Sequence, residues 1–416
     1  MTRSLIRVAV FPIALGALLA AACSSTGSPA GAAPERDPAP APATATDVGR
    51  APASPADAGG DSTAKHDPPN EKHEPLFVGR FDTTDPAGPR AAWPGARILA
   101  RFDGSAVSVK FSEFAEPWME GAPSYWEVRI DKGDWVPIAM IADNQPHVFE
   151  LAKGLPPGPH QVELFKRSET QTGMTQFLGF DFHGGKSLAP PPRQTRKIEV
   201  MGDSQATGFG IEMLNAPNHD CPGADHGGRW QNFRKAWGGR LGERFDAEVH
   251  GIVFSGKGVV KNITPADPDT LVKHYARTNP NPALQNSNPQ LFDLTSWIPD
   301  VIVLTHGSID FGASVDPSEF RAVYRAFVIN QLRARSPSTH IFLSVLGRGA
   351  REVITDLANS IVAERAAMGD DRIHAFVAND YTWEEMVACN GHGTPAWHDR
   401  ITTEIAAEIT KKVGWQ

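Results

Sequence analysis

A serine directly follows an expected strand, since residues 197–201 lead into Gly202, Asp203 and Ser204. A serine just past a buried strand, next to a glycine that permits close approach, can act as a nucleophile. Its own N–H can then face a developing oxyanion. Gly-Asp-Ser is also a common tripeptide that suits a turn with a helix cap. Its position at the end of the expected first strand of a domain favours the nucleophile.

A serine nucleophile needs a base, and His392 is the candidate. It lies in the loop 389–398, directly before an expected closing helix. The chain has 14 histidines, so a surface or capping role is the default interpretation for any one of them. A loop before the closing helix can nevertheless reach the sheet edge that carries Ser204, which favours His392 as the base.

The elements around these residues alternate between strands and helices from about residue 196 onward. Such alternation predicts an α/β domain over 195–416, with a parallel sheet covered by helices on both faces. Catalytic groups in such a sheet belong on the loops beyond the carboxyl ends of the strands. The expected strands are 197–201, 249–254, 301–304, 341–345 and 373–377, and the expected helices are 230–245, 317–335, 352–368 and 399–412.

The preceding segment, residues 76–190, has the period of short β-strands. Five runs alternate between apolar and polar residues, and turn sequences such as Asp131-Lys132-Gly133 separate them. Without any helical period, this pattern predicts an all-β domain, a β-sandwich or jelly roll. The runs are 98–102, 107–111, 126–130, 147–151 and 160–165.

The first 75 residues predict export. Residues 1–22 combine two early arginines with an apolar run, which is typical of a signal peptide. The sequence around Cys23 resembles a lipobox, although the alanine pair before it also suits an ordinary signal peptidase. Residues 23–75, rich in Ala and Pro, read as a disordered tether. We expect an envelope protein anchored in the membrane by lipid on Cys23, with Ser24 favouring the outer membrane, or a secreted one if Cys23 is unmodified.

Charge and cysteine content limit other functions. The formal net charge is −8 and no basic run exists, so no nucleic-acid partner is expected. No nucleotide-binding loop is visible, so no cofactor is expected. The residues 219–221, 225 and 226 include metal-ligand types without metal-site spacing, and they are read as loop residues. With Cys23 lipidated, Cys221 and Cys389 would either pair or remain free thiols.

Several motifs in order resemble the SGNH (GDSL-like) hydrolases. Gly202-Asp203-Ser204 is similar to their first block, and residues 254–262 are similar to their second. In that family the N–H of the second-block glycine, here Gly256, joins the oxyanion hole. Residues 307–311 stand where a Gly-Thr-Asn-Asp-Phe sequence is found, which places Asp310 in a supporting position. Cys389-x-x-His392 is similar to the histidine block, with His398 as a supporting residue.

The N-terminal half carries a second part of this resemblance. Its segments at 78–82, 93–95, 166–170 and 177–180 are similar in order and spacing to the jelly-roll domain of carbohydrate esterase family 2. The resemblance covers residues 76–416 and implies a jelly roll followed by a flavodoxin-like three-layer SGNH domain. It implies an acetyl esterase, similar to acetyl xylan esterases, acting on acetylated carbohydrate without metal or cofactor. Some members resemble a Ser-His dyad whose imidazole is oriented by a backbone carbonyl.

Three departures from the family pattern bear on activity. Ile309 occupies the place of an oxyanion Asn, Gly393 replaces a proline, and Cys389 stands where many SGNH enzymes have an Asp. Asp380 could orient His392 instead, against a role in a loop turn. Trp397 is either a sugar-stacking platform or a packing residue. The leading hypothesis is an acetyl esterase with Ser204 and His392; the alternatives are a catalytically weakened carbohydrate-binding protein or an acyl-transfer enzyme.

Overall fold

The computed structural model describes residues 73–115, 123–214, 221, 228–280 and 290–416. The expected signal peptide 1–22, Cys23 and nearly all of the tether 23–75 lie outside the described residues, as do His219, Asp220, Asp225 and His226. No helix in the described part of the chain is both long and apolar enough to span a membrane.

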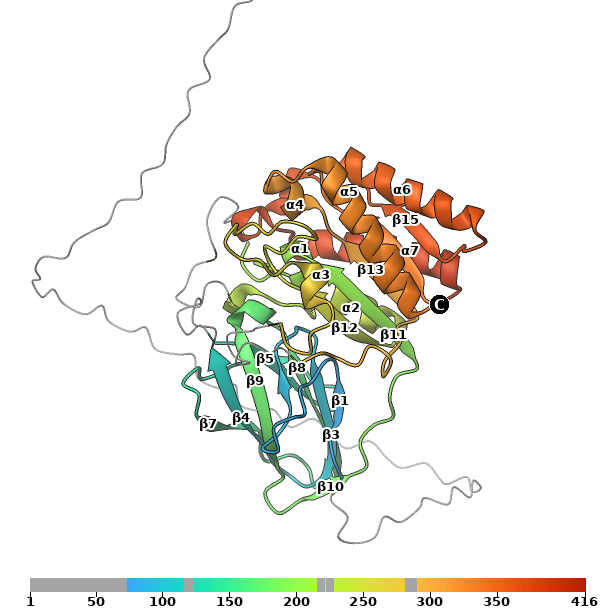
Figure 1. Cartoon of the computed structure of the whole chain (residues 1–416). Helices are drawn as coiled ribbons and strands as arrows, with labels where there is room; N and C mark the ends of the chain where they lie inside the picture. The colour runs from blue at the N-terminus through green and yellow to red at the C-terminus, as the bar shows by residue number, and fades with distance from the viewer. Residues whose placement is uncertain (1–72, 116–122, 215–220, 222–227, 281–289) are drawn as a thin grey trace, which may run out of the picture. The chain divides into compact units, whose positions relative to one another are not determined.

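Residues 76–188 form two antiparallel sheets around one apolar core (Figure 1). Inward residues such as Phe102, Phe111, Trp126 and Leu164 alternate with polar ones, as the sequence pattern predicted. One sheet has the order β1-β3-β8-β5-β6 with β10 on β3, and the other β2-β9-β4-β7. The strands are β1 Leu76–Val78, β2 Arg90–Ala91, β3 Arg97–Asp103, β4 Val107–Ala115, β5 Tyr125–Ile130, β6 Val136–Ala139, β7 Pro146–Ala152, β8 Pro159–Lys166, β9 Gly173–Asp181 and β10 Lys186–Leu188.

The following residues form a parallel five-stranded sheet, as alternation of strands and helices predicted. Its order is β12-β11-β13-β14-β15, which is the 2-1-3-4-5 order of flavodoxin-like folds. The switch point of that order lies between β11 and β13. The strands are β11 Arg196–Gly202, β12 Ala247–Val253, β13 Val301–Thr305, β14 His340–Val345 and β15 Ile373–Val377.

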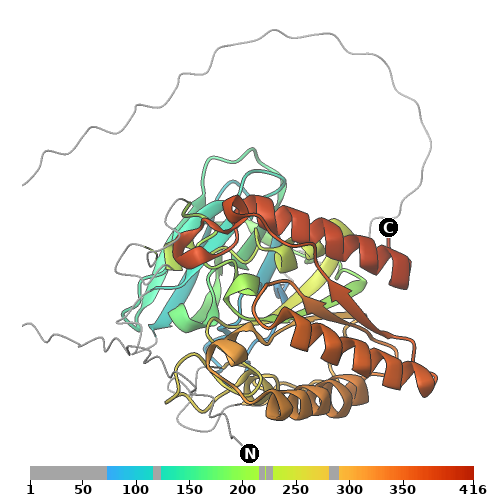
Figure 2. The same ribbon diagram turned by 90° about the horizontal axis from the view of Figure 1, so that it is seen from above.

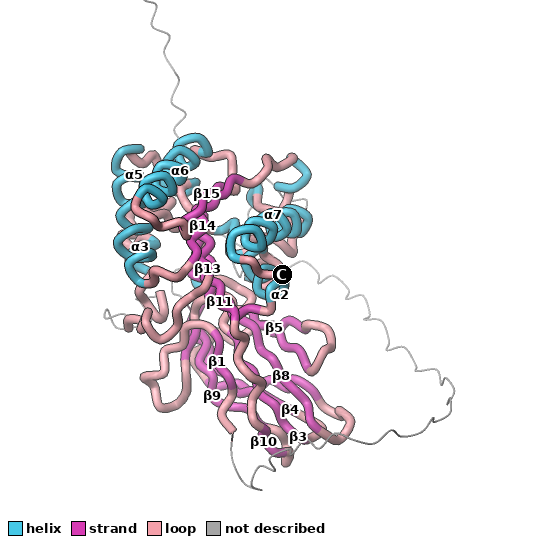
Figure 3. The backbone as a smooth tube through the Cα atoms, turned by 90° about the vertical axis from the view of Figure 1, so that its right-hand side faces the viewer, coloured by secondary structure: helices cyan, strands magenta, loops and turns pink. Residues whose placement is uncertain are grey.

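Helices cover both faces of this sheet (Figures 2 and 3). One apolar cluster joins the sheet to α2 and α7, and a second joins its other face to α3, α5 and α6. The helices are α1 Ser204–Thr207, α2 Trp237–Phe245, α3 Leu271–His274, α4 Ser308–Gly312, α5 Pro317–Ala326, α6 Arg351–Ala367 and α7 Pro395–Val413, with a π-helix Phe327–Arg333 continuing α5. Short 3-10 turns lie at Thr170–Thr172 (η2), Gly228–Trp230 (η3), Trp383–Met386 (η6) and Cys389–Gly391 (η7).

The expected helix 230–245 is wrong in its first half, because α2 begins only at Trp237. The backbone of the preceding segment instead bonds to other parts of the chain. The Asn232 N–H donates to Gly208 O at 3.1 Å, and the Phe233 N–H donates to Arg167 O at 2.8 Å. Tertiary hydrogen bonds thus replace the helical ones that the residue spacing suggested.

Buried polar contacts join the antiparallel sheets to the parallel sheet. Arg167 follows β8, and its guanidinium donates to the carbonyls of Gln231 at 2.9 Å and Arg229 at 2.8 Å. The guanidinium of Arg80, which is 1% exposed, donates to Arg277 O at 3.1 Å. Since buried polar groups of this kind are costly to leave unpaired, the two halves of the described chain act as one folded body.

Candidate active site

The segment after β11 presents Ser204 at the first position of α1. Asp203 is the N-cap of that helix, and its side chain accepts a hydrogen bond from the Gln205 N–H at 3.1 Å. Its other oxygen accepts from the Ser308 hydroxyl at 2.7 Å. Asp203 is buried, and this burial raises the pKa of its carboxyl. Asp203 therefore fixes the turn that carries Ser204 and joins this turn to α4. Its side chain does not line the cleft that Ser204 lines.

His392 lies across the same cavity, at the end of the 3-10 turn η7. Its Nδ1 lies 3.0 Å from the carbonyl oxygen of Cys389. A carbonyl only accepts, so Nδ1 must carry the proton, and Nε2 is left with the lone pair that a base requires. Asp380 does not orient this ring, because its carboxylate pairs with Arg348 at 2.7 Å.

Ser204 and His392 share one cleft with a volume of about 890 Å³. No hydrogen bond joins these two described side chains directly, as is common for catalytic pairs without substrate. The loops behind them are tied together, because the Gly393 N–H donates to the Gln205 side chain at 3.1 Å. The rest of the lining comprises Gln171, Phe209, Cys221, Phe254, Ser255, Gly256, Lys257, Asn262, Ile263, Thr264, Ala266, Asp267, Ile309 and Asn390.

A disulfide fixes the histidine loop. Cys221 and Cys389 are bonded, with their Cα atoms 5.2 Å apart, which settles the alternative that the sequence left open. Cys389 is also the residue whose carbonyl orients His392. The ring of Phe209 packs against His392 with centroids 4.7 Å apart. Covalent and packing contacts therefore hold the imidazole in one orientation.

Backbone N–H groups of Ser204 and Gly256 are available to an oxyanion. Within the described part of the chain, neither N–H donates to a protein acceptor. Gly256 has φ +74°, and a Cβ added to it would lie 2.7 Å from the Ile263 side chain. A glycine is therefore needed at this position, where the backbone turns toward the cleft.

The two supporting candidates, Asp310 and His398, lie behind the cleft. Asp310 accepts hydrogen bonds from the N–H groups of Val259, Val260 and Lys261 at 2.7–3.0 Å, so it shapes the loop after Gly256. His398 is buried in α7, where its Nδ1 accepts from the Trp237 N–H at 3.2 Å. Neither residue lines the cleft. Trp397 is 1% exposed and belongs to the core, so it is a packing residue.

Ile309 lines the cleft together with Ser204 and Gly256. The structure thus places an apolar side chain in the cleft at the position where the resemblance expects an oxyanion Asn. It follows Ser308, whose hydroxyl is bonded to Asp203, so the start of α4 is held beside the start of α1. The site offers two backbone donors and no amide donor at this position.

The antiparallel half contributes residues that the sequence alone did not assign to the site. Gln171, in η2, lines the cleft, and Glu169 binds Ser255 beside Gly256. The polar run Arg167–Thr170 directly follows β8, and the structure shows that it is buried. Buried polar residues require partners, so such a run indicates an interface.

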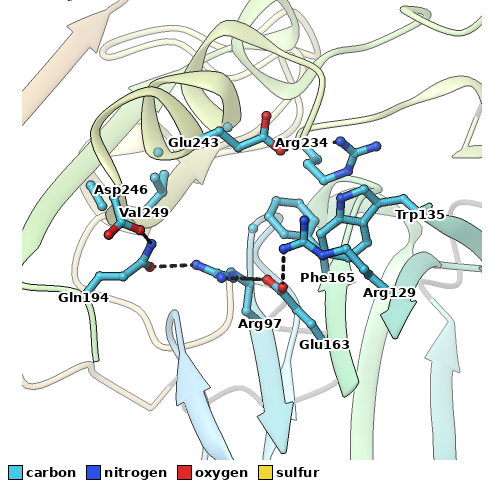
Figure 4. A pocket seen from close by; sticks show the side chains of 14 residues that line it. Arg97, Arg129, Trp135, Glu163, Phe165, Gln194, Arg234, Glu243, Asp246 and Val249 are labelled. Atoms are coloured by element: carbon cyan, nitrogen blue, oxygen red, sulfur yellow. Dashed lines mark hydrogen bonds and ion pairs between the residues drawn. The ribbon is translucent and has the colours of Figure 1, made fainter. Parts of the chain in front are cut away.

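A second cavity, of about 410 Å³, lies between β3, β5, β8 and α2 (Figure 4). Several of its polar side chains bind one another. Glu163 binds both Arg97 and Arg129 at 2.6 Å, and Gln194 donates to Asp246 at 2.8 Å. The described residues that line it include no Ser, Cys or His. Among the described residues, no cluster of three or more His, Cys, Asp or Glu is arranged to hold a metal ion.

The pKa of His392 predicts how the rate should depend on pH. Burial of the imidazole lowers its pKa to about 4. The neutral ring is the base, and protonation of Nε2 occurs only as the pH falls through that value. We therefore expect turnover of p-nitrophenyl acetate to persist at pH 5 and to be lost near pH 4, measured as kcat/KM between pH 3.5 and 9. Complete loss near pH 6.5 would contradict this assignment of the base.

Comparison with known proteins agrees with the resemblance read from the motifs. Residues 77–192 match the family described as Carbohydrate esterase 2 N-terminal. The chain is 29% identical over 350 residues to the cellulase/esterase CelE of Acetivibrio thermocellus, covering 82% of this chain and 40% of that protein. It is 27% identical over 252 residues to an acetylxylan esterase / glucomannan deacetylase of Cellvibrio japonicus, covering 59% and 64%. The chain thus spans less than two thirds of either relative.

A solved structure supports the same relationship. A family two carbohydrate esterase from Clostridium thermocellum, in complex with cellohexaose, has a TM-score of 0.73 and 27% sequence identity. The match covers 82% of this chain and all of that one. The similarity to family 2 carbohydrate esterases therefore extends over both halves of the described chain, and the resemblance predicted from the motifs is confirmed.

Proposed function

We propose that this protein is a serine esterase that removes acetyl groups from an acetylated polysaccharide or oligosaccharide. The observation that carries the proposal is the orientation of His392. Its Nδ1 donates to the Cys389 carbonyl, which leaves Nε2 free to act as a base, and His392 lines the same cleft as Ser204. Nucleophile, base and two free backbone N–H groups in one cleft are the parts that ester hydrolysis requires.

The reaction follows from this arrangement in two steps. Ser204 Oγ attacks the acetyl carbonyl while Nε2 of His392 takes the hydroxyl proton, and the N–H groups of Ser204 and Gly256 bind the oxyanion. The imidazolium gives the proton to the sugar oxygen as its bond to the acetyl carbon breaks, so the sugar leaves with a hydroxyl and the acetyl group stays on Ser204. Water, deprotonated by His392, then attacks the acetyl-enzyme; the bond to Ser204 Oγ breaks, acetate leaves, and the imidazolium returns the proton to Ser204 Oγ. No cofactor enters either step.

A glycan substrate is supported by the relatives and by the shape of the cleft. The similar proteins include an acetylxylan esterase / glucomannan deacetylase and an esterase solved with cellohexaose. The cleft volume of about 890 Å³ greatly exceeds that of an acetyl group, which leaves room for sugar rings.

We also propose a fold for the antiparallel half and a cellular location for the protein. The antiparallel half is proposed to be a jelly roll, in keeping with the match to the N-terminal domain of family 2 esterases. Residues 1–22 and Cys23 support export and lipid anchoring at the cell envelope. Such a location would give the enzyme access to polysaccharides outside the cell.

The second candidate is a carbohydrate-binding protein with weakened catalysis. Ile309 favours it, since an apolar side chain at that position cannot donate to an oxyanion. Ser204, His392 and the Cys389 carbonyl are nevertheless all in place, and a site released from catalytic selection has no reason to keep its oriented base. We therefore favour the esterase.

Acetate release from acetylated glycans tests the proposal. The purified protein is incubated with p-nitrophenyl acetate, acetylated xylan and acetylated glucomannan, beside its Ser204→Ala variant. We expect release from the ester and from at least one glycan, and a drop to background in the variant, because the nucleophile is gone. Equal rates for the two proteins on all three substrates would contradict the esterase and leave glycan binding as the function.

A further inference from the structure

A buried carboxylate from the antiparallel half reaches the loop that carries Gly256. Glu169 occupies the N-cap position of η2 and is fully buried. One of its oxygens accepts from the Ser255 N–H at 2.8 Å, and the other accepts from the Ser255 hydroxyl at 2.7 Å. Ser255 directly precedes Gly256. Glu169 therefore contacts the residue next to Gly256 from 86 residues away in the sequence.

We propose that Glu169 is a positioning residue for the oxyanion hole, which fixes the N–H of Gly256 through its two bonds to Ser255. The inference rests on the proposed esterase function and adds a part to it. The antiparallel half then serves the chemical step, in addition to any role in binding glycan.

The bonds around Gly256 leave its peptide group little freedom. Ser255 is held on one side by Glu169, and the Gly256 carbonyl accepts from the Ile263 N–H at 2.9 Å on the other. Further along the loop, Asp310 holds three consecutive N–H groups. Upstream of Ser255, the Phe254 N–H donates to Gly202 O at 3.1 Å, so loss of the Glu169 contact would free Ser255 itself and the peptide that carries the Gly256 N–H. A donor stabilises an oxyanion only if it points at the oxyanion position before reaction.

The partners of Glu169 indicate that the ionised carboxylate is the working form. Besides Ser255, the side-chain amides of Gln171 and Gln231 donate to it at 2.7 and 2.9 Å. An ionised carboxylate only accepts, which suits four donors. A protonated carboxyl must donate one bond, and among these partners only the Ser255 hydroxyl can accept it. Protonation therefore disturbs the contacts that hold Ser255.

Burial makes this protonation accessible near neutral pH, against the attraction of a nearby cation. Lys166 is the buried cation near Glu169, and its ammonium bonds to the carbonyls of Ser168 and Glu169. The buried carboxylate of Glu113 also attracts the Lys166 ammonium. Burial outweighs the attraction of Lys166 and raises the pKa of Glu169 to about 7. The rate should therefore show a partial step near pH 7, separate from the loss near pH 4 that His392 causes.

The test replaces Glu169 by its neutral isostere. We expect Glu169→Gln to lower kcat for p-nitrophenyl acetate by about tenfold to a hundredfold, since a misplaced oxyanion donor is costly. KM should change little. The step near pH 7 should disappear, so that the variant follows the low plateau of the parent between pH 5 and 6 and shows only the loss near pH 4. Ser255→Ala, which removes only the hydroxyl bond, should lower kcat by a smaller factor.

Glu127→Gln is the matched control. Glu127 is buried at the same junction, where it binds Asn232 at 2.9 Å and Arg234 at 2.5 Å without touching Ser255. We expect this variant to keep the kcat and both pH steps of the parent, even if it melts at a lower temperature. If both Glu→Gln variants lose kcat in proportion to the drop in their melting temperatures, Glu169 is a structural residue only. The same conclusion follows if Glu169→Gln keeps the step near pH 7.

Two readouts separate failure of this inference from failure of the proposed function. The parent compared with Ser204→Ala reports whether the protein is an esterase at all. If the parent is active and Glu169→Gln matches it in kcat and in the pH profile, only the positioning role is overturned. Should Glu169→Gln fail to fold, Ser255→Ala still decides: an unchanged kcat and pH step in that variant would contradict the proposal.

Discussion

Replacing His392 by alanine is expected to lower kcat/KM for p-nitrophenyl acetate by at least about 10³-fold. The structure gives the reason, because the Nδ1 proton is committed to the Cys389 carbonyl and only Nε2 can take the proton of Ser204. Without the imidazole, the serine hydroxyl would have to attack with its proton still attached. Because the ring is not fully enclosed and the disulfide remains, we expect the variant to fold.

Two further measurements separate a lost base from a damaged fold. Free imidazole at high concentration should restore part of the rate in His392→Ala, since the cleft of about 890 Å³ can admit it. His398→Ala provides the matched control, because that buried histidine bonds to Trp237 and does not line the cleft. It should melt at a lower temperature and keep kcat within about threefold of the parent. Equal losses in the two variants, with no rescue, would contradict the assignment of His392.

The substitution Ile309→Asn is expected to raise kcat by about tenfold to a hundredfold. Ile309 lines the cleft beside Ser204 and Gly256, so an amide at this position could add a third donor to the two backbone N–H groups. Asn is smaller than Ile, so it fits without overpacking. A donor that acts on the oxyanion strengthens only in the transition state, so kcat should rise while KM stays similar.

Ile309→Leu is the control for this gain, because leucine has the shape of asparagine without its donor. It should keep the kcat of the parent. A similar gain in both variants would show that the shape of the side chain, rather than hydrogen bonding, limits the rate. An unchanged or lower kcat in Ile309→Asn alone would mean that the site uses its two backbone donors and cannot accept a third.

The spacing of apolar residues and the positions of the strand ends in the sequence were enough to predict the main features of the fold. They also identified the two central residues of the candidate site, Ser204 and His392. The alternation of short strand-like runs with helical segments predicted the parallel strands, and the structure confirms all five with small changes at their ends. Because the carboxyl ends of parallel strands meet at one edge, the residues after β11, β12 and β13 had to lie together. That rule places Ser204, Gly256 and Ile309 around one cleft, as the structure does.

Contacts between distant segments were decided only by the tertiary structure. The sequence left open whether Cys221 and Cys389 pair across 168 residues, and whether Asp380 or a carbonyl orients His392. It also did not show that Glu169, in the antiparallel half, binds Ser255 in the other half. Local sequence patterns indicate which face of a helix or strand is buried. They do not indicate which side chains from other elements contact that face. The partner of a buried polar group depends on how whole sheets and helices pack, which no short window of sequence contains.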